Sequence, residues 1–150
     1  MNERKMIIMK GIPGSGKDYT ANTLAPKENI FSTDDFWMKD GKYVFVPALL
    51  GKAHQWNMDR VHDALKEGKS PVIVNNTNIK KRDYAPYLSF AKKFGYDVEV
   101  VMPTSPWWKE IYPRIKDGTF TDKDVMEFFV RNTHNVPFEA IKRMMDNWQE

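Results

Sequence analysis

The feature that most constrains the fold is the glycine-rich segment Gly11-Ile12-Pro13-Gly14-Ser15-Gly16-Lys17. A short apolar run, Lys5 to Lys10, precedes this segment and is typical of a buried parallel strand. Residues 17–24 follow it and predict a helix. A GxxxxGK pattern between a strand and a helix is typical of a loop that binds nucleotide phosphates, because its backbone N–H groups and the positive helix end attract anions. The segment therefore predicts an α/β fold with a phosphate-binding loop.

Further strands and helices alternate along the rest of the chain. The sequence predicts strands at residues 29–31, 71–74 and 96–102, and helices at residues 47–67, 80–94 and from Pro106 onward. Thr121 with Asp124 forms a capping-box-like start within that last region. Asp40-Gly41 predicts a turn, in a small hairpin between Phe36-Trp37 and residues 43–45. This alternation predicts one α/β domain, residues 1–150, with a central parallel sheet and helices on both faces.

Composition excludes several classes of protein and site. The chain has 150 residues, enough for one domain, and its lack of cysteine excludes disulfides, thiolate zinc sites and cysteine nucleophiles. Its net charge of +3 permits a partner that carries phosphate without requiring one. Its three histidines are too scattered to suggest a metal triad. No apolar run is long enough for a membrane span or a signal peptide, so we expect a cytoplasmic protein without a membrane partner.

The loop itself predicts a binding site for ATP. Gly11, Pro13, Gly14, Ser15 and Gly16 are expected to surround the phosphates, and Lys17 to bridge the β- and γ-phosphates. One position departs from the motif: the residue after the lysine is normally Ser or Thr, whose hydroxyl ligates Mg²⁺, and here it is Asp18. Two interpretations stay open. Asp18 binds Mg²⁺ directly as a hard oxygen ligand, or its charge weakens ATP binding and marks a site in decline.

Two adjacent carboxylates end the second predicted strand, in the segment Ser32-Thr33-Asp34-Asp35. The carboxyl ends of parallel strands meet at one edge of the sheet, so these acids are expected to face the phosphate loop. A carboxylate there can accept the proton of a substrate hydroxyl that attacks the γ-phosphate. We therefore predict that Asp34 is a general base, whereas Asp35 either contacts substrate or caps the next helix.

These motifs, with several others, resemble the polynucleotide-kinase-like P-loop family. Members of this family include the phage 5′-hydroxyl polynucleotide kinase and kinase-like domains of some animal ubiquitin-ligase-binding proteins, and the chain resembles the second group more. The matching segments are GxPGSGK at residues 11–17, Phe31-Ser32-Thr33-Asp34-Asp35-Phe36, Asp40-Gly41-x-Tyr43, Ala53-His54-x-Trp56-Asn57-x-x-Arg60, Ser70-Pro71-Val72-Ile73, Asn76-Thr77-Asn78 and Arg131-Asn132-x-His134-x-Val136-Pro137. The resemblance implies a P-loop NTPase fold with a C-terminal helical lid.

The resemblance also implies roles for individual residues. Asp34, the first aspartate of the pair, is the general base, and Arg131 lies on a lid helix and contacts the ATP phosphates. The phage enzyme carries a substrate-binding arginine where this chain has Trp37, which either stacks on a base or packs in the core. Arg60 shares one helix face with His54 and Asn57, and this face either lines the substrate channel or serves solvent exposure or helix capping. Asn78 in the Asn-Thr-Asn segment is a further candidate for substrate contact.

A second departure concerns the acid that this family carries in or next to its Asn-Thr-Asn segment, where it serves the metal. The chain has Asn75-Asn76-Thr77-Asn78 there, with no acid. Our hypothesis is that the metal's carboxylate moved to Asp18; independent decay of both positions is the alternative.

The sequence thus predicts an ATP- and Mg²⁺-dependent phosphotransferase acting on a hydroxyl, foremost the 5′-hydroxyl of a polynucleotide or nucleotide. A kinase of a small hydroxylated metabolite and a non-catalytic nucleotide-binding module are the alternatives.

Overall fold

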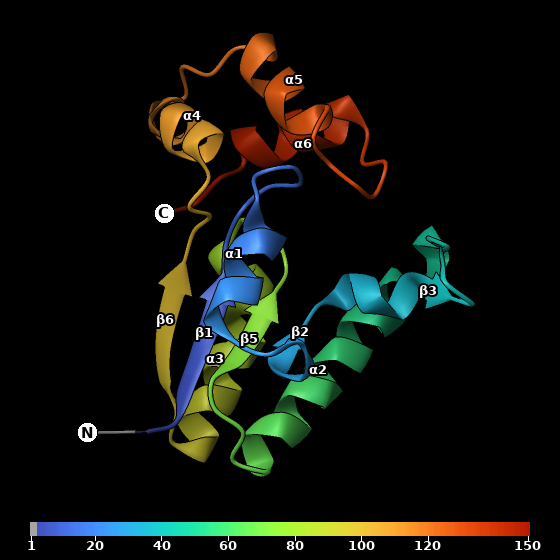
Figure 1. Cartoon of the computed structure of the whole chain (residues 1–150), viewed down its shortest axis with the longest axis vertical. Coiled ribbons are helices and arrows are strands. Elements are labelled where there is room, and N and C mark those ends of the chain that lie inside the picture. Colours follow the sequence, from blue (N-terminus) through green and yellow to red (C-terminus); the bar gives the residue numbers. More distant parts are fainter. Residues whose placement is uncertain (1–2) are drawn as a thin grey trace.

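A four-stranded parallel sheet lies at the centre of the protein, in a computed structural model that describes residues 3–150 (Figure 1). The strands are β1 (Lys5–Met9), β2 (Ile30–Phe31), β3 (Met38–Lys39), β4 (Lys42–Tyr43), β5 (Val72–Asn75) and β6 (Asp97–Val101). The helices are α1 (Lys17–Leu24), α2 (Leu50–Lys66), α3 (Lys81–Phe94), α4 (Pro106–Asp117), α5 (Asp122–Phe129) and α6 (Phe138–Asp146). Short 3-10 helices lie at Lys27–Asn29, Thr33–Trp37 and Pro47–Leu49. The predicted α/β fold is confirmed.

The order of strands in the sheet is β2-β5-β1-β6, which places β1 at its interior. Ile7 of β1 pairs in parallel with Ile73 of β5 and with Glu99 of β6. Because every strand is parallel, the loop after β1 and the aspartates after β2 leave the sheet at the same edge. The topology therefore agrees with the prediction that the phosphate loop and the double aspartate lie at the same edge of the sheet.

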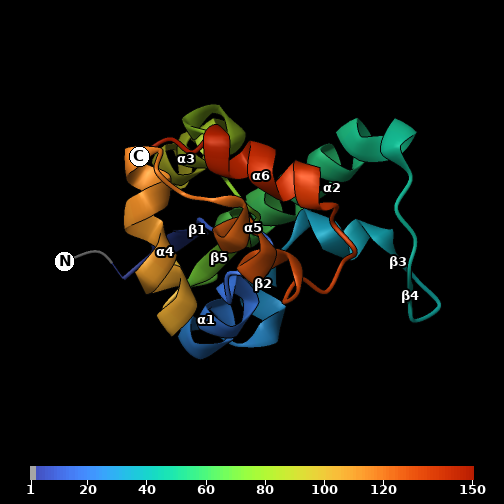
Figure 2. The same ribbon diagram turned by 90° about the horizontal axis from the view of Figure 1, so that it is seen from above.

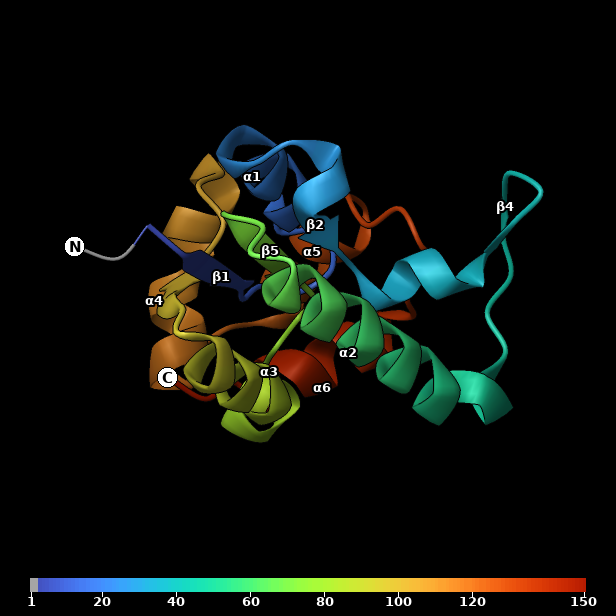
Figure 3. The same cartoon turned by 90° about the horizontal axis from the view of Figure 1, so that it is seen from below.

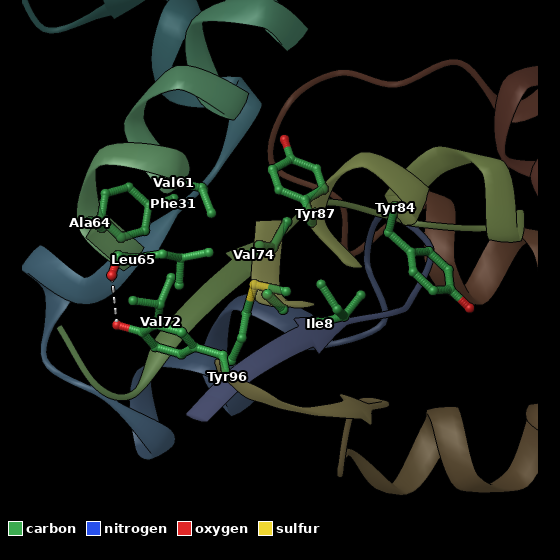
Figure 4. Close-up of a cluster of buried hydrophobic side chains, with 12 residues drawn as sticks. Ile8, Phe31, Val61, Ala64, Leu65, Val72, Val74, Tyr84, Tyr87 and Tyr96 are labelled. Atoms are coloured by element: carbon green, nitrogen blue, oxygen red, sulfur yellow. Dashed lines mark hydrogen bonds between the residues drawn. The ribbon is translucent and has the colours of Figure 1, made fainter. Parts of the chain in front are cut away.

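Helices cover both faces of the sheet, as Figure 3 shows, with α1 on one side and α2 and α3 on the other. Side chains alternate along β1, so Met6 and Ile8 join the cluster beneath α2 and α3, while Ile7 and Met9 pack on the side of α1. The larger cluster appears in Figure 4, where the Tyr96 hydroxyl donates to the Leu65 carbonyl at 3.2 Å. Its buried members are Met6, Ile8, Phe31, Val61, Ala64, Leu65, Val72, Val74, Tyr84, Tyr87, Ala91 and Tyr96.

Helices α4, α5 and α6 form a lid over the carboxyl edge of the sheet (Figures 1 and 2). Ile12 from the glycine-rich loop is fully buried in the apolar core of this lid, so loop and lid pack as one unit. The predicted capping box of Thr121 and Asp124 is present. The helical pattern expected from Pro106 onward is interrupted at Gly118, whose φ of 73° ends α4, and in residues 130–137. We call residues 130–137 the lid loop.

The predicted hairpin belongs to residues 38–49, a segment that we call the arm. The arm lies beside α2, at the right of Figures 1 and 3. Asp40 and Gly41 have φ values of 51° and 76°, the positive pair that a two-residue hairpin turn needs. Its strands are shorter than expected, because Phe36 and Trp37 belong to the preceding 3-10 helix instead. Among residues 3–150, no helix is long and apolar enough to cross a membrane.

Candidate active site

The glycine-rich loop connects β1 to α1 and has the backbone of a phosphate cradle. Gly14 and Gly16 adopt φ values of 80° and 87°, in the left-handed region that suits glycine. A Cβ at Gly14 would lie 2.0 Å from the Phe128 carbonyl oxygen, so the lid also requires glycine there. No side chain caps the N-terminus of α1, and the Ser15 hydroxyl is buried without a hydrogen-bond partner among residues 3–150. The uncapped backbone N–H groups at this positive helix end are what an anion would bind, whereas the fully buried Ser15 hydroxyl does not line the pocket beside them.

Lys17, Asp18 and Asn75 form a triangle of polar contacts beside this cradle. The Lys17 ammonium donates to Asn75 Oδ1 at 2.9 Å and lies 3.2 Å from Asp18 Oδ1. Asn75 completes the triangle by donating from Nδ2 to the same Asp18 oxygen at 2.9 Å. The two positions that depart from the family's pattern are therefore in direct contact. This contact fits a carboxylate that serves the same place from the first turn of α1 instead of from the end of β5.

The ionisation of Asp18 follows from the same contacts. Partial burial acts to raise the pKa of this carboxyl, but Lys17 and the hydrogen bond from Asn75 act the other way. The net result is a pKa below the ordinary value. With 63% of its side chain exposed, Asp18 is an ionised carboxylate that solvent and ligands can reach.

The lid contacts the loop through Trp107, which in turn contacts Arg131. Trp107 Nε1 donates to the Gly14 carbonyl at 2.9 Å, and the Arg131 guanidinium lies 4.3 Å above the Trp107 ring. Arg131 lies in the lid loop just after α5, not on a lid helix as expected, and it pairs with Glu127 of the last turn of α5 at 3.3 Å. Loop and lid together enclose a pocket of about 180 Å³, here called the loop pocket. Its lining includes Pro13, Gly14, Gly16, Lys17, Asp18, Tyr19, Asp34, Tyr43, Arg131 and His134.

A second, larger cavity opens between α1, α2 and the double aspartate. This side cleft has a volume of about 800 Å³, and Lys27, Asp35, Trp56 and Arg60 line it. Asp18, Asp34 and His134 line both cavities, so the loop pocket and the side cleft meet at these three side chains. Two binding spaces that meet at a carboxylate suit the transfer of a group from one to the other.

Asp34 and Asp35 differ in their surroundings. Asp34 Oδ1 accepts a hydrogen bond from the Tyr43 hydroxyl at 3.2 Å, and its carboxylate faces both cavities. Asp35 pairs instead with Arg60 at 3.3 Å, at the wall of the side cleft. Of the two adjacent aspartates, Asp34 is therefore the one that lines both binding spaces.

Comparison with known proteins identifies the family. A family model described as an AAA domain matches residues 6–150. The chain belongs to the AAA domain family. NEDD4-binding protein 2 of Homo sapiens is 35% identical to it over 147 residues, a match that covers 96% of the chain and 8% of the human protein. The chain thus spans a small part of that relative's length. The expected relationship to polynucleotide-kinase-like P-loop proteins is confirmed.

Solved structures support the fold of this AAA domain. A chain of the Pnkp1/Rnl/Hen1 RNA repair complex superposes with a TM-score of 0.61 at 18% identity, covering 98% of this chain and 44% of the other. A candidate kinase from Chloroflexus aurantiacus superposes with a TM-score of 0.54 at 16% identity, covering 98% of this chain and 80% of the other. At such identities the likeness shows the fold alone, that of an α/β P-loop NTPase.

For this AAA domain the structure favours core packing over base stacking at Trp37, and it contradicts the expectations for Asn78 and Gly11. Trp37 is 2% exposed and packs its ring edge-on against Phe36 and Phe45, so it offers no face to a base. Asn78 is buried and donates to the Met9 carbonyl at 2.7 Å, which makes it a structural contact. Gly11 is buried too, and its N–H donates to the Thr77 carbonyl at 3.0 Å, so it is not available to a phosphate.

The face of α2 that carries His54, Asn57 and Arg60 does not line one channel. Asn57 is buried and donates to the Tyr87 hydroxyl at 3.1 Å. Its Oδ1 accepts from Arg60 Nη2 at 2.7 Å, and the Arg60 guanidinium stacks 3.8 Å from the Trp56 ring centre. Only Arg60 of the three reaches the side cleft. The structure keeps Arg60 and Asp35 as candidates for substrate contact.

Tyr43 and His134 lie in the site although sequence reasoning gave them no role. Their rings are 4.5 Å apart, and both line the loop pocket. Both belong to segments that carry the family resemblance, so a signal was present. Nothing in the sequence indicated that residues 91 positions apart would meet at Asp34.

Proposed function

We propose that this AAA domain is an ATP- and Mg²⁺-dependent phosphotransferase. The observation that carries the proposal is that the loop pocket and the side cleft meet at Asp34. The loop pocket has the volume and donors for a triphosphate, and the side cleft would receive the acceptor hydroxyl.

The protein groups that the reaction needs all line these two cavities. Asp34 accepts the proton of the acceptor hydroxyl while the oxygen of that hydroxyl forms a bond to the γ-phosphorus. The bond between this phosphorus and the bridging oxygen of the β-phosphate breaks. Lys17 and Arg131 offset the negative charge on the phosphates, as preorganised cations do. The leaving group is ADP, and the proton remains on Asp34 until solvent removes it.

The residues present fit a magnesium ion. Among residues 3–150 there is no group of three or more acidic or histidine side chains arranged for a metal. Mg²⁺ does not require such a group, because it usually binds through one or two carboxylates together with waters and substrate phosphates. Asp18 would hold it, with Asn75 and Lys17 fixing the carboxylate from behind. When bound, the ion would neutralise charge on the phosphates.

The acceptor is proposed to be the 5′-hydroxyl of a polynucleotide or nucleotide. A cleft of about 800 Å³ lies in the upper range for sites that enclose a whole drug-sized molecule, which favours a nucleotide over a smaller metabolite. Lys27 and Arg60 on its wall supply cations for phosphate groups. The likeness to a chain of an RNA repair complex also favours this acceptor.

A transfer assay with γ-labelled ATP tests the proposal. DNA and RNA oligonucleotides with a free 5′-hydroxyl, a nucleoside, and a reaction without acceptor are compared, with 5′-phosphorylated oligonucleotides as blocked controls. We expect label on the 5′-hydroxyl oligonucleotides alone, its loss in Lys17→Ala, and normal transfer in Lys66→Ala, which removes a lysine outside both cavities. Transfer only to small hydroxylated compounds would favour a metabolite kinase. ATP binding without transfer would favour a non-catalytic module.

A further inference from the structure

Asp34 is held from two sides by segments far apart in the sequence. On one side, the Tyr43 hydroxyl on the arm donates to Asp34 Oδ1 at 3.2 Å. On the other, His134 Nε2 in the lid loop lies 3.8 Å from Asp34 Oδ2. This second distance exceeds that of a hydrogen bond, so Oδ2 keeps a lone pair for another donor.

The two flanking side chains also contact each other. The Tyr43 and His134 rings lie 4.5 Å apart between centroids with an angle of 31° between their planes. This contact joins the arm to the lid loop at the wall of the loop pocket, which both residues line. An aromatic contact of this kind contributes about 0.5–1.5 kcal/mol beyond the area that it buries.

The lid loop is built to hold His134 in place. Asn132 Oδ1 accepts from the Val136 N–H at 2.9 Å, and Asn132 Nδ2 donates to the Phe129 carbonyl at 2.6 Å. These bonds close the loop on both sides of His134. Asn135 adds a φ of 55°, a left-handed turn that asparagine tolerates well.

Tyr43 is a dependable donor to Asp34. Burial raises the pKa of the Tyr43 phenol, and the neighbouring Asp34 carboxylate raises it further. The hydroxyl therefore keeps its proton at neutral pH and can only donate to the carboxylate. Asp35 has no such partner, since its carboxylate pairs with Arg60.

We propose that Tyr43 and His134 form a clamp that positions Asp34, with the lid closing onto the arm through their ring contact. This inference rests on the proposed phosphotransferase. Tyr43 fixes Oδ1, so Oδ2 is the oxygen that takes the acceptor's proton, and His134 limits the swing of the carboxylate. Both are positioning residues, because they act on the reaction through Asp34.

Paired variants separate the polar group from the ring. Tyr43→Phe keeps the ring and loses the hydroxyl, and we expect kcat to fall about tenfold with the KM for ATP within about twofold. His134→Phe keeps the ring contact and should lower kcat less than His134→Ala. The double variant Tyr43→Phe with Asp34→Asn should be no slower than Asp34→Asn alone, because Tyr43 acts only through that carboxylate. Tyr112→Phe is the matched control, since this hydroxyl also donates to a carboxylate, that of Glu150, but lies outside both cavities.

Hydrogen–deuterium exchange tests the clamp without any turnover. His134→Ala should raise exchange in the arm, residues 38–49, and Tyr43→Ala should raise it in the lid loop, whereas Tyr43→Phe should leave both near wild type. If the protein shows this exchange pattern but transfers no phosphate, the proposed function is refuted, while the ring contact between Tyr43 and His134 is supported. Unchanged exchange in both alanine variants, or full additivity of Tyr43→Phe with Asp34→Asn, would overturn the clamp.

Discussion

Replacing Asp18 by serine restores the common phosphate-loop motif, yet we expect it to weaken the binding of Mg-ATP. A phosphate oxygen on Lys17 Nζ would lie within about 6 Å of Asp18, because the ammonium is 3.2 Å from that carboxylate. At this separation two unit charges repel by about 0.7 kcal/mol in a water-like medium and about 2.8 kcal/mol at an effective dielectric constant of 20. Asp18 is 63% exposed, which favours the lower part of this range.

Two opposing effects therefore act on ATP affinity in Asp18→Ser. Without Mg²⁺, loss of the repulsion should tighten ATP binding by about 1 kcal/mol, or about fivefold. With Mg²⁺, the variant lacks the carboxylate that holds the ion, and we expect about tenfold weaker binding, in line with the loss of a group that supports a metal. The sign of the change should thus reverse between EDTA and Mg²⁺, and the weakening should grow as free Mg²⁺ is lowered.

Isothermal titration of ATP against four proteins measures this reversal. They are the wild type, Asp18→Ser, Asn75→Asp and the double variant, each titrated with EDTA and with Mg²⁺. The double variant should recover Mg-ATP affinity and transfer, because the acid is back at the strand end, and such non-additivity is expected when two residues share one partner. Asp63→Ser is the charge control, since this exposed aspartate on α2 lines neither cavity. Tighter binding of Mg-ATP to Asp18→Ser alone would refute the relocation and favour a non-catalytic module.

Three further substitutions test the site and its packing. Asp34→Asn should lower turnover by about 10²–10⁴ while ATP binding stays near normal, as measured by steady-state kinetics and titration; a mild effect beside a damaging Asp35→Asn would reverse the assignment of the pair. Arg131→Ala should reduce transfer with little change in thermal unfolding, because its guanidinium acts on phosphate charge, and unchanged transfer would give Arg131 a structural role. Trp37→Ala should reduce the free energy of unfolding by about 3–5 kcal/mol in urea titrations, whereas unchanged stability with weaker acceptor binding would restore a stacking role for Trp37.

Local patterns were enough to predict the sheet, its flanking helices and the position of the phosphate loop. The apolar run before Gly11 and the helix after Lys17 place that loop at a sheet edge without any knowledge of distant contacts. The hairpin turn was likewise predictable, since Asp40 and Gly41 are residue types that accept a positive φ. Such features depend on residues that are neighbours in the sequence, so they can be predicted from local sequence patterns.

The errors concern residues whose environment is set by distant partners. Trp37 is buried because the arm brings Phe45 against its ring, and Asn78 because it meets Met9, 69 residues away. Spacing carries no information about such contacts. Tyr43 and His134 escaped assignment for the same reason, because their meeting depends on how the arm and the lid loop are placed in space.

The identity of residue 75 gives a chemical reason to consider the two motif departures together. An asparagine amide can donate and accept at once, and Asn75 does both, donating to Asp18 and accepting from Lys17. An aspartate at 75 could only accept, and its charge would face the Asp18 carboxylate across a contact of 2.9 Å. Once an acid stands at position 18, a neutral amide is therefore the better neighbour. Independent decay would leave no reason for residue 75 to be a group that pairs with both the ammonium and the carboxylate.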